Sequence, residues 1–216
     1  MSAASGFFGV GPELAAAAAR VGLAESLLCG VTTVADHHLT WPAGIDPVEL
    51  AGATIDSAAS SGARLVFVRG TARDDPVTAA QSIAGIHDTY LAGAVDGVSD
   101  DGRLQLAVGP SGVHADGPET FTALREVATA LGLRRRTQAN EQVDVAIAAE
   151  RYGRRPLELL DDWGWLEPDV TIAHLCEVTA GEIELLAARR VTATHAPGCD
   201  IPMGWGIAPV DRKSVV

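Results

Sequence analysis

Titratable side chains stand at the ends of several short apolar runs in this chain. His37, His174 and His195 each follow such a run, and Glu141 comes three residues after Gln138. Carboxylate and imidazole groups are the usual carriers of protons in acid–base catalysis, and imidazole is also a common metal ligand. These residue types predict proton-transfer or metal-dependent chemistry, provided that the fold brings the ends of the runs together.

The apolar runs are spaced like the strands of a parallel α/β protein. They alternate with Ala- and Leu-rich stretches of helical character, which is the pattern of repeated β-α units. The six runs are Val31 to Ala35, Arg64 to Arg69, Leu104 to Gly109, Leu133 to Gln138, Val170 to His174 and Val191 to His195. Their ends recur about every 32 residues, so eight such units would need about 256 residues, close to the size of a (β/α)8 barrel.

Six runs therefore predict an α/β fold of the partial (β/α)8 TIM-type barrel class. The alternative is a doubly wound sheet, which would usually place a glycine-rich phosphate turn after its first strand. The segment Asp36 to Trp41 is nothing like such a turn. Barrel enzymes gather catalytic residues from the carboxyl ends of several strands, which is where this chain has its histidines. The placement favours the barrel.

Three helices have recognisable start signals. In each, an oxygen-bearing side chain is followed at a short interval by a glutamate that can reach back to the exposed amides. These signals are Asp46 to Glu49, Asp116 to Glu119 and Thr179 to Glu182. The Trp163 and Trp165 pair is expected to pack between a helix and a strand.

Charge and cysteine content exclude several classes of protein. The chain has 28 acidic and 16 basic residues, a net charge of −12, which argues against nucleic acid as a partner. Leu65 to Val68 and Leu104 to Val108 are far shorter than the roughly 20 residues of a membrane helix, so no membrane partner is expected. Cys29, Cys176 and Cys199 cannot all pair with one another, so a reduced, cytoplasmic location is expected. They have no Cys-x-x-Cys spacing to support a thiolate metal site, so buried thiols are expected.

A set of motifs is spread along the chain from about Pro12 to Val210. The motifs are Glu25 to His38, Arg69-Gly70, Thr137 to Glu141, Tyr152 to Leu157, Trp163 to Trp165, Ile172 to Leu175 and Thr194 to Pro197. Together they resemble the metal-dependent amidohydrolase superfamily, and within it the chain looks most like the branch of guanine, cytosine and 8-oxoguanine deaminases and s-triazine hydrolases.

The resemblance implies a barrel in which the six runs are strands two to seven, with strands one and eight missing. In this family one Zn²⁺ or Fe²⁺ is held by a His-x-His pair on the first strand, a His on the fifth and an Asp on the eighth. The metal acidifies a bound water that attacks the substrate. By position, Glu141 is the proton shuttle, His174 is the sixth-strand His that steers the substrate, and Gln138 stands where the metal-binding His belongs.

The strand with the metal position departs from the family. Where members commonly have His-Thr-His, this chain has Arg136-Thr137-Gln138. Alternation puts Arg136 and Gln138 on the inner face of that strand. A glutamine amide is a poor zinc ligand, and an inward arginine is costly without an acid beside it. Each differs from a His codon by one base, so either the site has been dismantled or the sequence was misread.

Two further histidine positions are candidates for substrate binding. His195 ends its strand facing inward and is expected to line the substrate pocket. His37 and His38 are adjacent and face opposite ways on a strand, so at least one should pack in a loop, and His37 is the candidate for the pocket. His114 is expected to be structural.

We divide the chain into a partial amidohydrolase barrel domain over residues 1–210 and a tail over residues 211–216. The tail, Asp211 to Val216, matches the translation of a widely used sequencing adapter and contains Lys213, the only lysine in the chain. We expect it to be artefactual.

The expected function is metal-dependent hydrolytic deamination of an amino-substituted N-heterocycle, an 8-oxoguanine-like purine or an s-triazine, by the full-length parent protein. Zn²⁺ or Fe²⁺ would be the cofactor of that parent. The chain as written is expected to bind no catalytic metal and to be inactive, and it could form a homo-oligomer through an open barrel edge. The alternative is a non-catalytic pseudoenzyme, or an incomplete product that acts only by association.

Overall fold

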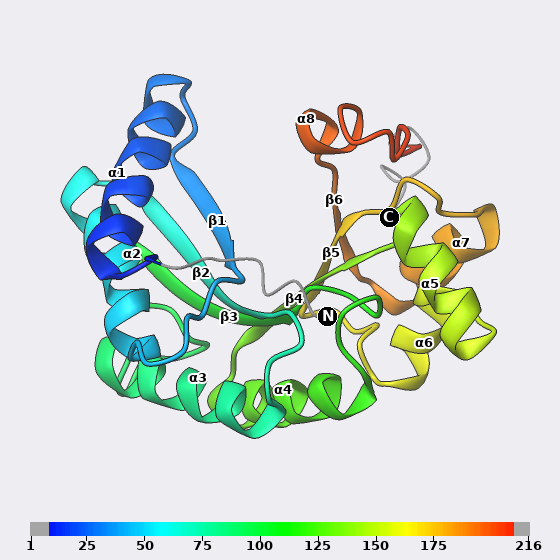
Figure 1. Cartoon of the computed structure of the whole chain (residues 1–216), viewed down its shortest axis with the longest axis horizontal. Helices are drawn as coiled ribbons and strands as arrows, with labels where there is room; N and C mark the ends of the chain where they lie inside the picture. Colours follow the sequence, from blue (N-terminus) through cyan, green and yellow to red (C-terminus); the bar gives the residue numbers. More distant parts are fainter. Residues whose placement is uncertain (1–8, 210–216) are drawn as a thin grey trace.

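The computed structural model describes residues 9–209, which contain one sheet of six parallel strands in the order β1-β2-β3-β4-β5-β6. The strands are β1 Thr33–His38, β2 Arg64–Thr71, β3 Leu104–Pro110, β4 Arg134–Ala139, β5 Val170–His174 and β6 Thr192–Thr194. The sheet curls so that β1 and β6 rise on opposite sides of an open half-barrel (Figure 1). The partial barrel expected from the sequence is confirmed.

Helices α2 to α7 lie on the outside of the curl, between successive strands, while α1 precedes β1 and α8 follows β6 (Figure 1). The helices are α1 Pro12–Leu28, α2 Pro47–Ser61, α3 Pro76–Tyr90, α4 Pro118–Leu131, α5 Gln142–Tyr152, α6 Pro156–Asp162, α7 Ala180–Arg189 and α8 Pro197–Asp200. No helix in this part of the chain combines the length and apolar character needed to cross a membrane. The outer helices leave the inner face of the sheet for functional side chains.

The first and last strands begin later than expected, for the same physical reason. The Val31 amide bonds to the Ser26 carbonyl at 2.8 Å, and the Val191 amide bonds to the Leu186 carbonyl at 3.1 Å. Each residue thus closes the turn after a helix and cannot pair in the sheet. Because β1 extends to His38, both His37 and His38 lie in a strand, and the expectation that one packs in a loop is wrong.

Two of the three expected helix caps are confirmed. The Asp46 carboxylate accepts a hydrogen bond from the Val48 amide at 2.9 Å, and Thr179 forms a reciprocal capping box with Glu182. The third is wrong, because the cap position of α4 is Gly117. The Asp116 carboxylate instead accepts bonds from the Thr71 hydroxyl and the Arg73 amide, so it ties β2 to the loop after β3.

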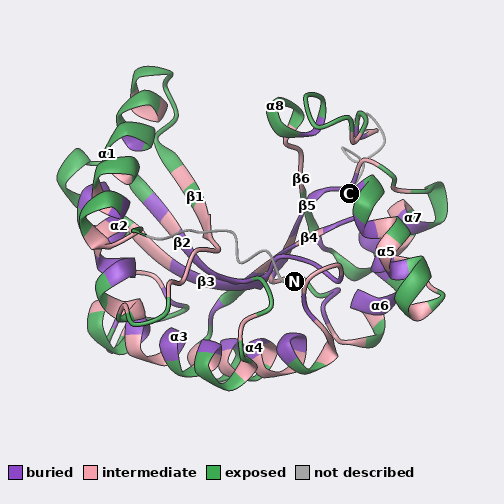
Figure 2. Cartoon of the chain, in the orientation of Figure 1, coloured by how far each residue is buried: buried purple, intermediate pink, exposed green. Residues whose placement is uncertain are grey.

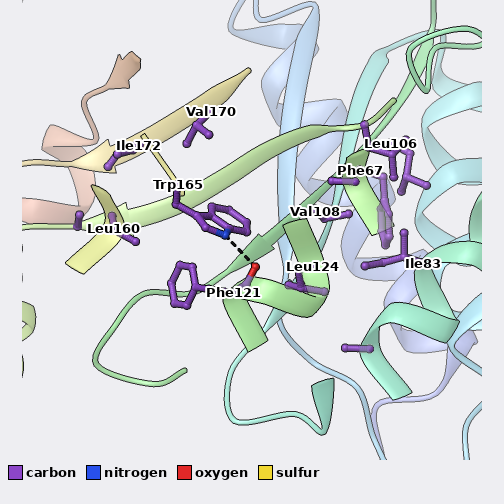
Figure 3. Close-up of a cluster of buried hydrophobic side chains, with 14 of the residues drawn as sticks. Phe67, Ile83, Leu106, Val108, Phe121, Leu124, Leu160, Trp165, Val170 and Ile172 are labelled. Carbon is purple, nitrogen blue, oxygen red and sulfur yellow. Dashed lines mark hydrogen bonds between the residues drawn. The ribbon is translucent and has the colours of Figure 1, made fainter. Parts of the chain in front are cut away.

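The core lies between the sheet and the outer helices, where buried residues gather along β2, β3 and β5 (Figure 2). Phe67, Val108 and Ile172 of the strands are fully buried, and so is Phe121 of α4 (Figure 3). The Trp165 indole stacks edge-on against Phe121 and donates a 2.8 Å hydrogen bond to its carbonyl (Figure 3). The expected packing role of the tryptophans is confirmed.

The expectation of buried thiols is wrong for most of the cysteines. Cys29 and Cys199 are exposed and Cys176 is half-buried. Cys29 follows the last residue of α1 and Cys199 lies in the short surface helix α8, so neither reaches the core. Lys213 and the rest of the expected tail, residues 211–216, lie outside the described residues.

We predict that Trp165→Phe lowers the free energy of unfolding by about 1–3 kcal/mol, the usual cost of leaving a buried polar group without its partner. The phenyl ring keeps the contact with Phe121, but the buried carbonyl loses its donor. Denaturant unfolding measures the change. Trp163→Phe is the matched control, since Trp163 contacts Phe121 and Tyr152 through its ring. Equal stabilities of the two variants would contradict the prediction.

Candidate active site

The ends of β4 and β5 are joined by backbone hydrogen bonds that continue past the sheet. The Leu175 amide bonds to the Ala139 carbonyl at 3.0 Å, and the Glu177 amide bonds to the Asn140 carbonyl at 2.8 Å. Asn140, His174 and Leu175 have φ angles of 56°, 71° and 59°. Such left-handed backbone is uncommon outside glycine and is concentrated at functional sites.

This junction brings together Glu141 and His174, the two residues expected to be catalytic. His174 Nε2 lies 3.2 Å from Glu141 Oε1, and both residues are buried, with exposed fractions of 7% and 2%. Burial raises the pKa of the Glu141 carboxyl, and the charges of His174 and His114 oppose that rise. A carboxyl with a raised pKa can hold and release a proton closer to neutral pH.

Asp200 completes this group, although the sequence analysis did not identify it. Its side chain is fully buried, and its Oδ1 lies 2.5 Å from His174 Nδ1. A carboxylate can only accept a hydrogen bond, so Nδ1 carries the proton and Nε2 is the ring nitrogen that faces Glu141. His174 is therefore held between two carboxyl groups.

His195 lies at the edge of this group. Its Nδ1 is 3.8 Å from Asp200 Oδ2, which is within ion-pair range and too long for a hydrogen bond. The expectation that His195 ends its strand is wrong, because β6 ends at Thr194 and His195 lies just beyond it, where its acidic partner is Asp200. Its role as a substrate-pocket residue stays a prediction.

His37 faces the inner side of the sheet, while its neighbour His38 packs on Trp41 and Phe67. The His37 Nε2 donates to the Gly109 carbonyl on β3 at 2.9 Å. Burial lowers the pKa of His37, and the charge of Arg136 lowers it further. His37 is thus a neutral imidazole on the inner face, and its binding role stays a prediction.

Arg136 and Gln138 share the inner face of β4, as the alternation of the strand predicts. Arg135, Thr137 and Ala139 are buried on the other side, where Arg135 pairs with acids of the outer layer. The Arg134 to Arg136 run is therefore part of a strand.

The residues present do not fit the metal that the resemblance implies. Among residues 9–209, no three His, Cys, Asp or Glu side chains gather closely enough to hold an ion. Gln138 offers an amide where zinc prefers imidazole, thiolate or carboxylate, and Arg136 brings a positive charge to the same face. The arrangement can hold and move a proton between Glu141 and His174.

His114 forms a second carboxyl–imidazole pair near the same junction. Its Nδ1 lies 3.2 Å from Asp144 Oδ1, and this hydrogen bond raises the pKa of His114. Asp144 also accepts a bond from the Asn140 amide at 2.9 Å. The pair holds the turn between β4 and α5, which agrees with the structural role expected for His114.

Known proteins are similar to this chain in sequence and in fold. The chain is 33% identical over 202 residues to the 5-methylthioadenosine/S-adenosylhomocysteine deaminase of Nitratidesulfovibrio vulgaris. The aligned region covers 93% of this chain and 43% of that protein. It is 30% identical over 210 residues to the 8-oxoguanine deaminase of Pseudomonas aeruginosa, covering 92% and 46%. The chain thus spans about half the length of the curated relatives it matches. No protein-family model matches it.

Solved structures of hydrolases and deaminases are similar to this chain in fold. A variant of the atrazine chlorohydrolase of Arthrobacter aurescens, complexed with zinc and atraton, superposes with a TM-score of 0.86 at 30% identity, covering 95% of this chain and 47% of that one. A zinc-bound adenosine deaminase from Xanthomonas campestris superposes with a TM-score of 0.83 at 22% identity, which supports the fold.

We predict that Asp200→Asn lowers the fraction of His174 rings that carry their proton on Nδ1. A hydrogen bond to a charged acceptor is roughly twice as strong as one to a neutral amide, so the preference for Nδ1–H should weaken. The ¹⁵N shifts of the His174 ring, measured above its titration range, report the change. Asp144→Asn is the matched control, because it should alter the ring of His114 and leave that of His174 unchanged. Unaltered His174 shifts in Asp200→Asn would refute the assignment.

Proposed function

The chain belongs to the metal-dependent amidohydrolase superfamily, in the branch of deaminases and triazine hydrolases, and we propose that the protein of which it is part hydrolyses an amino-substituted N-heterocycle. One observation carries the proposal. A buried glutamate with a raised pKa faces a histidine across 3.2 Å, at the carboxyl ends of two adjacent barrel strands. That is where barrel enzymes carry out their chemistry.

The proposed reaction needs a group that moves one proton. In hydrolytic deamination the oxygen of water bonds to the ring carbon, the carbon–nitrogen bond breaks, and a proton from water goes to the departing amine. Burial prepares Glu141 to take up and release that proton. His174 orients the substrate with Nε2, because Asp200 occupies its other ring nitrogen.

The substrate class that we propose is a purine such as 8-oxoguanine, or an s-triazine. The support is the naming of the relatives: one curated relative is an 8-oxoguanine deaminase, and one structural neighbour holds the triazine atraton. His37 and His195 are the proposed substrate-binding residues, since His37 lies on the inner face and His195 lies beside Asp200. A cytoplasmic location and a homo-oligomer belong to the same proposal.

We further propose that this chain itself, with Arg136 and Gln138, holds no catalytic metal and turns over no substrate. The metal of the family supplies the activated water, and neither Glu141 nor His174 can lower the pKa of water toward neutrality as a bound metal does. The support is the donor chemistry of the inner face of β4, where an amide and a guanidinium replace imidazoles.

We predict that the purified chain binds no stoichiometric zinc and does not turn over 8-oxoguanine, guanine, isocytosine or a triazine. Metal analysis after dialysis and an ammonia-release assay measure this. The double variant Arg136→His, Gln138→His is the informative companion, and we expect it to remain inactive, because two imidazoles on one strand do not make a complete ligand set. Turnover by the unaltered chain, with zinc bound, would refute this part of the proposal.

We predict that Glu141→Gln separates proton transfer from metal binding in an extended protein that has His at position 138. Metal content should be nearly unchanged, and turnover should fall by a factor of about 10² to 10⁴, the usual contribution of general acid–base catalysis. Replacing His at position 138 should instead remove the metal. Full activity of Glu141→Gln would show that Glu141 is not the proton shuttle.

A further inference from the structure

The turns that carry Glu141 and His174 have a backbone that needs support from its surroundings. Asn140 and His174 have left-handed φ angles of 56° and 71°, and neither residue is a glycine. Such conformations persist only where the surrounding structure stabilises them. The Glu177 amide donates to the Asn140 carbonyl at 2.8 Å, so it joins the turn after β4 to the turn after β5. A contact that fixes Glu177 therefore also bears on the position of Glu141.

Arg155, which precedes α6, binds the segment after β5 and the helix that follows it. Its Nη2 donates to the Glu177 carbonyl at 2.7 Å. Its Nε and Nη2 also donate to the two carboxylate oxygens of Glu182 on α7, at 2.8 and 2.9 Å. A guanidinium that bonds both oxygens of a carboxylate has a defined orientation. The pair with Glu182 thus aims the remaining N–H of Nη2 at Glu177.

Glu182 is a fixed and charged partner for this arginine. It is 7% exposed, and its Oε2 also accepts hydrogen bonds from the Thr179 amide at 2.8 Å and from the Thr179 hydroxyl at 3.0 Å. Burial alone would raise the pKa of the Glu182 carboxyl, but hydrogen bonds that include those from Arg155 and Thr179 outweigh burial and lower it. Glu182 therefore stays ionised near neutral pH.

The neighbouring arginine has acidic partners of the same kind, but only within its own helix. Arg154 pairs with Glu158 and Asp162, which both lie in α6. Its side chain is 40% exposed, against 33% for Arg155. The ion pairs of Arg154 thus act within α6, whereas the contacts of Arg155 join the start of α6 to two places beyond β5.

We propose that Arg155 is a positioning residue that keeps Glu141 opposite His174. It acts through Glu177, whose carbonyl it binds and whose amide bonds to the residue before Glu141. Glu141 is the N-cap of α5, so a shift of that turn would move its carboxyl relative to the imidazole. The inference rests on the proposed function for the use of these two side chains, while their geometry follows from the contacts of this chain.

The test compares Arg155→Gln with Arg154→Gln in the purified chain. A neutral amide cannot replace the paired N–H bonds of a guanidinium, so hydrogen exchange of the Glu177 amide should become faster by about tenfold or more. Water should then reach Glu141, and because burial raises the pKa of its carboxyl, that pKa should fall toward its ordinary value. The ¹³C titration of the Glu141 side chain measures the change. Arg154→Gln should leave both quantities as they are in the unaltered chain.

Arg155→Lys is the conservative variant. Lysine keeps the charge but not the planar fork, so the pKa of Glu141 should lie between those of the unaltered chain and Arg155→Gln. Thermal unfolding checks that each variant is folded, and if Arg155→Gln is not, the same comparison is made with Arg155→Lys. A loss of stability alone would not shift the pKa of Glu141 in the folded chain, so this pKa separates positioning from a merely structural role.

A raised Glu141 pKa that is unchanged in the folded Arg155 variant, or equal changes in Arg154→Gln, would overturn the proposal. The proposed function fails in a different way. If Glu141 of the unaltered chain titrates at its ordinary value, the hydrolase loses its proton carrier, and the exchange of the Glu177 amide still decides whether Arg155 holds the turn.

Discussion

The parallel pairing of β4 with β5 determines where chemistry is possible in this chain. Parallel strands end at one edge of the sheet, and the hydrogen bonds beyond Ala139 and His174 keep these two ends in contact. The left-handed backbone at Asn140 and His174 then turns the segments that follow β4 and β5 sharply away from the sheet. As a result Glu141 and His174 face each other, although 33 positions separate them in the sequence. Without that register the carboxyl and the imidazole would have no common site.

Some charged groups in this part of the structure have a partner of opposite charge, and one has none. Glu141, His174 and Asp200 lie together, with the imidazole between two carboxyl groups that can compensate its charge. Burial of such a group is tolerable because each charge has an opposite partner or can be neutralised by a proton. Arg136 has neither option, because a guanidinium does not release its proton in proteins. The cost of burial is therefore offset within the group of Glu141, His174 and Asp200, whereas the half-buried Arg136 has no acid to offset it in the described part of the chain.

Periodicity and residue type were sufficient to predict the curled parallel sheet and the inward faces of Arg136 and Gln138, whereas the meeting of Glu141 with His174 was implied by the family resemblance. The sheet and the inward faces depend on strand spacing and alternation, which are local properties of the chain. Asp200 could not be predicted in this way, because it reaches His174 only after the chain has passed through β6 and turned into α8. Asp116 has the sequence of a helix cap, but its carboxylate instead accepts hydrogen bonds from the Thr71 hydroxyl at the end of β2 and from the Arg73 amide in the loop that follows. Val31 and Val191 have strand propensity, yet each closes the turn after a helix.

The pKa of the Glu141 carboxyl is the quantity on which proton transfer at this site depends. It can be measured in the chain itself from the pH dependence of the Glu141 side-chain ¹³C shift, with Glu141→Gln identifying the signal. If burial beside His174 governs the group, the carboxyl titrates above its ordinary value of 4.5. Titration at or below that value would mean that the charges of His174 and His114 outweigh burial. Glu141 would then be a permanently ionised partner of His174, unable to carry a proton near neutral pH.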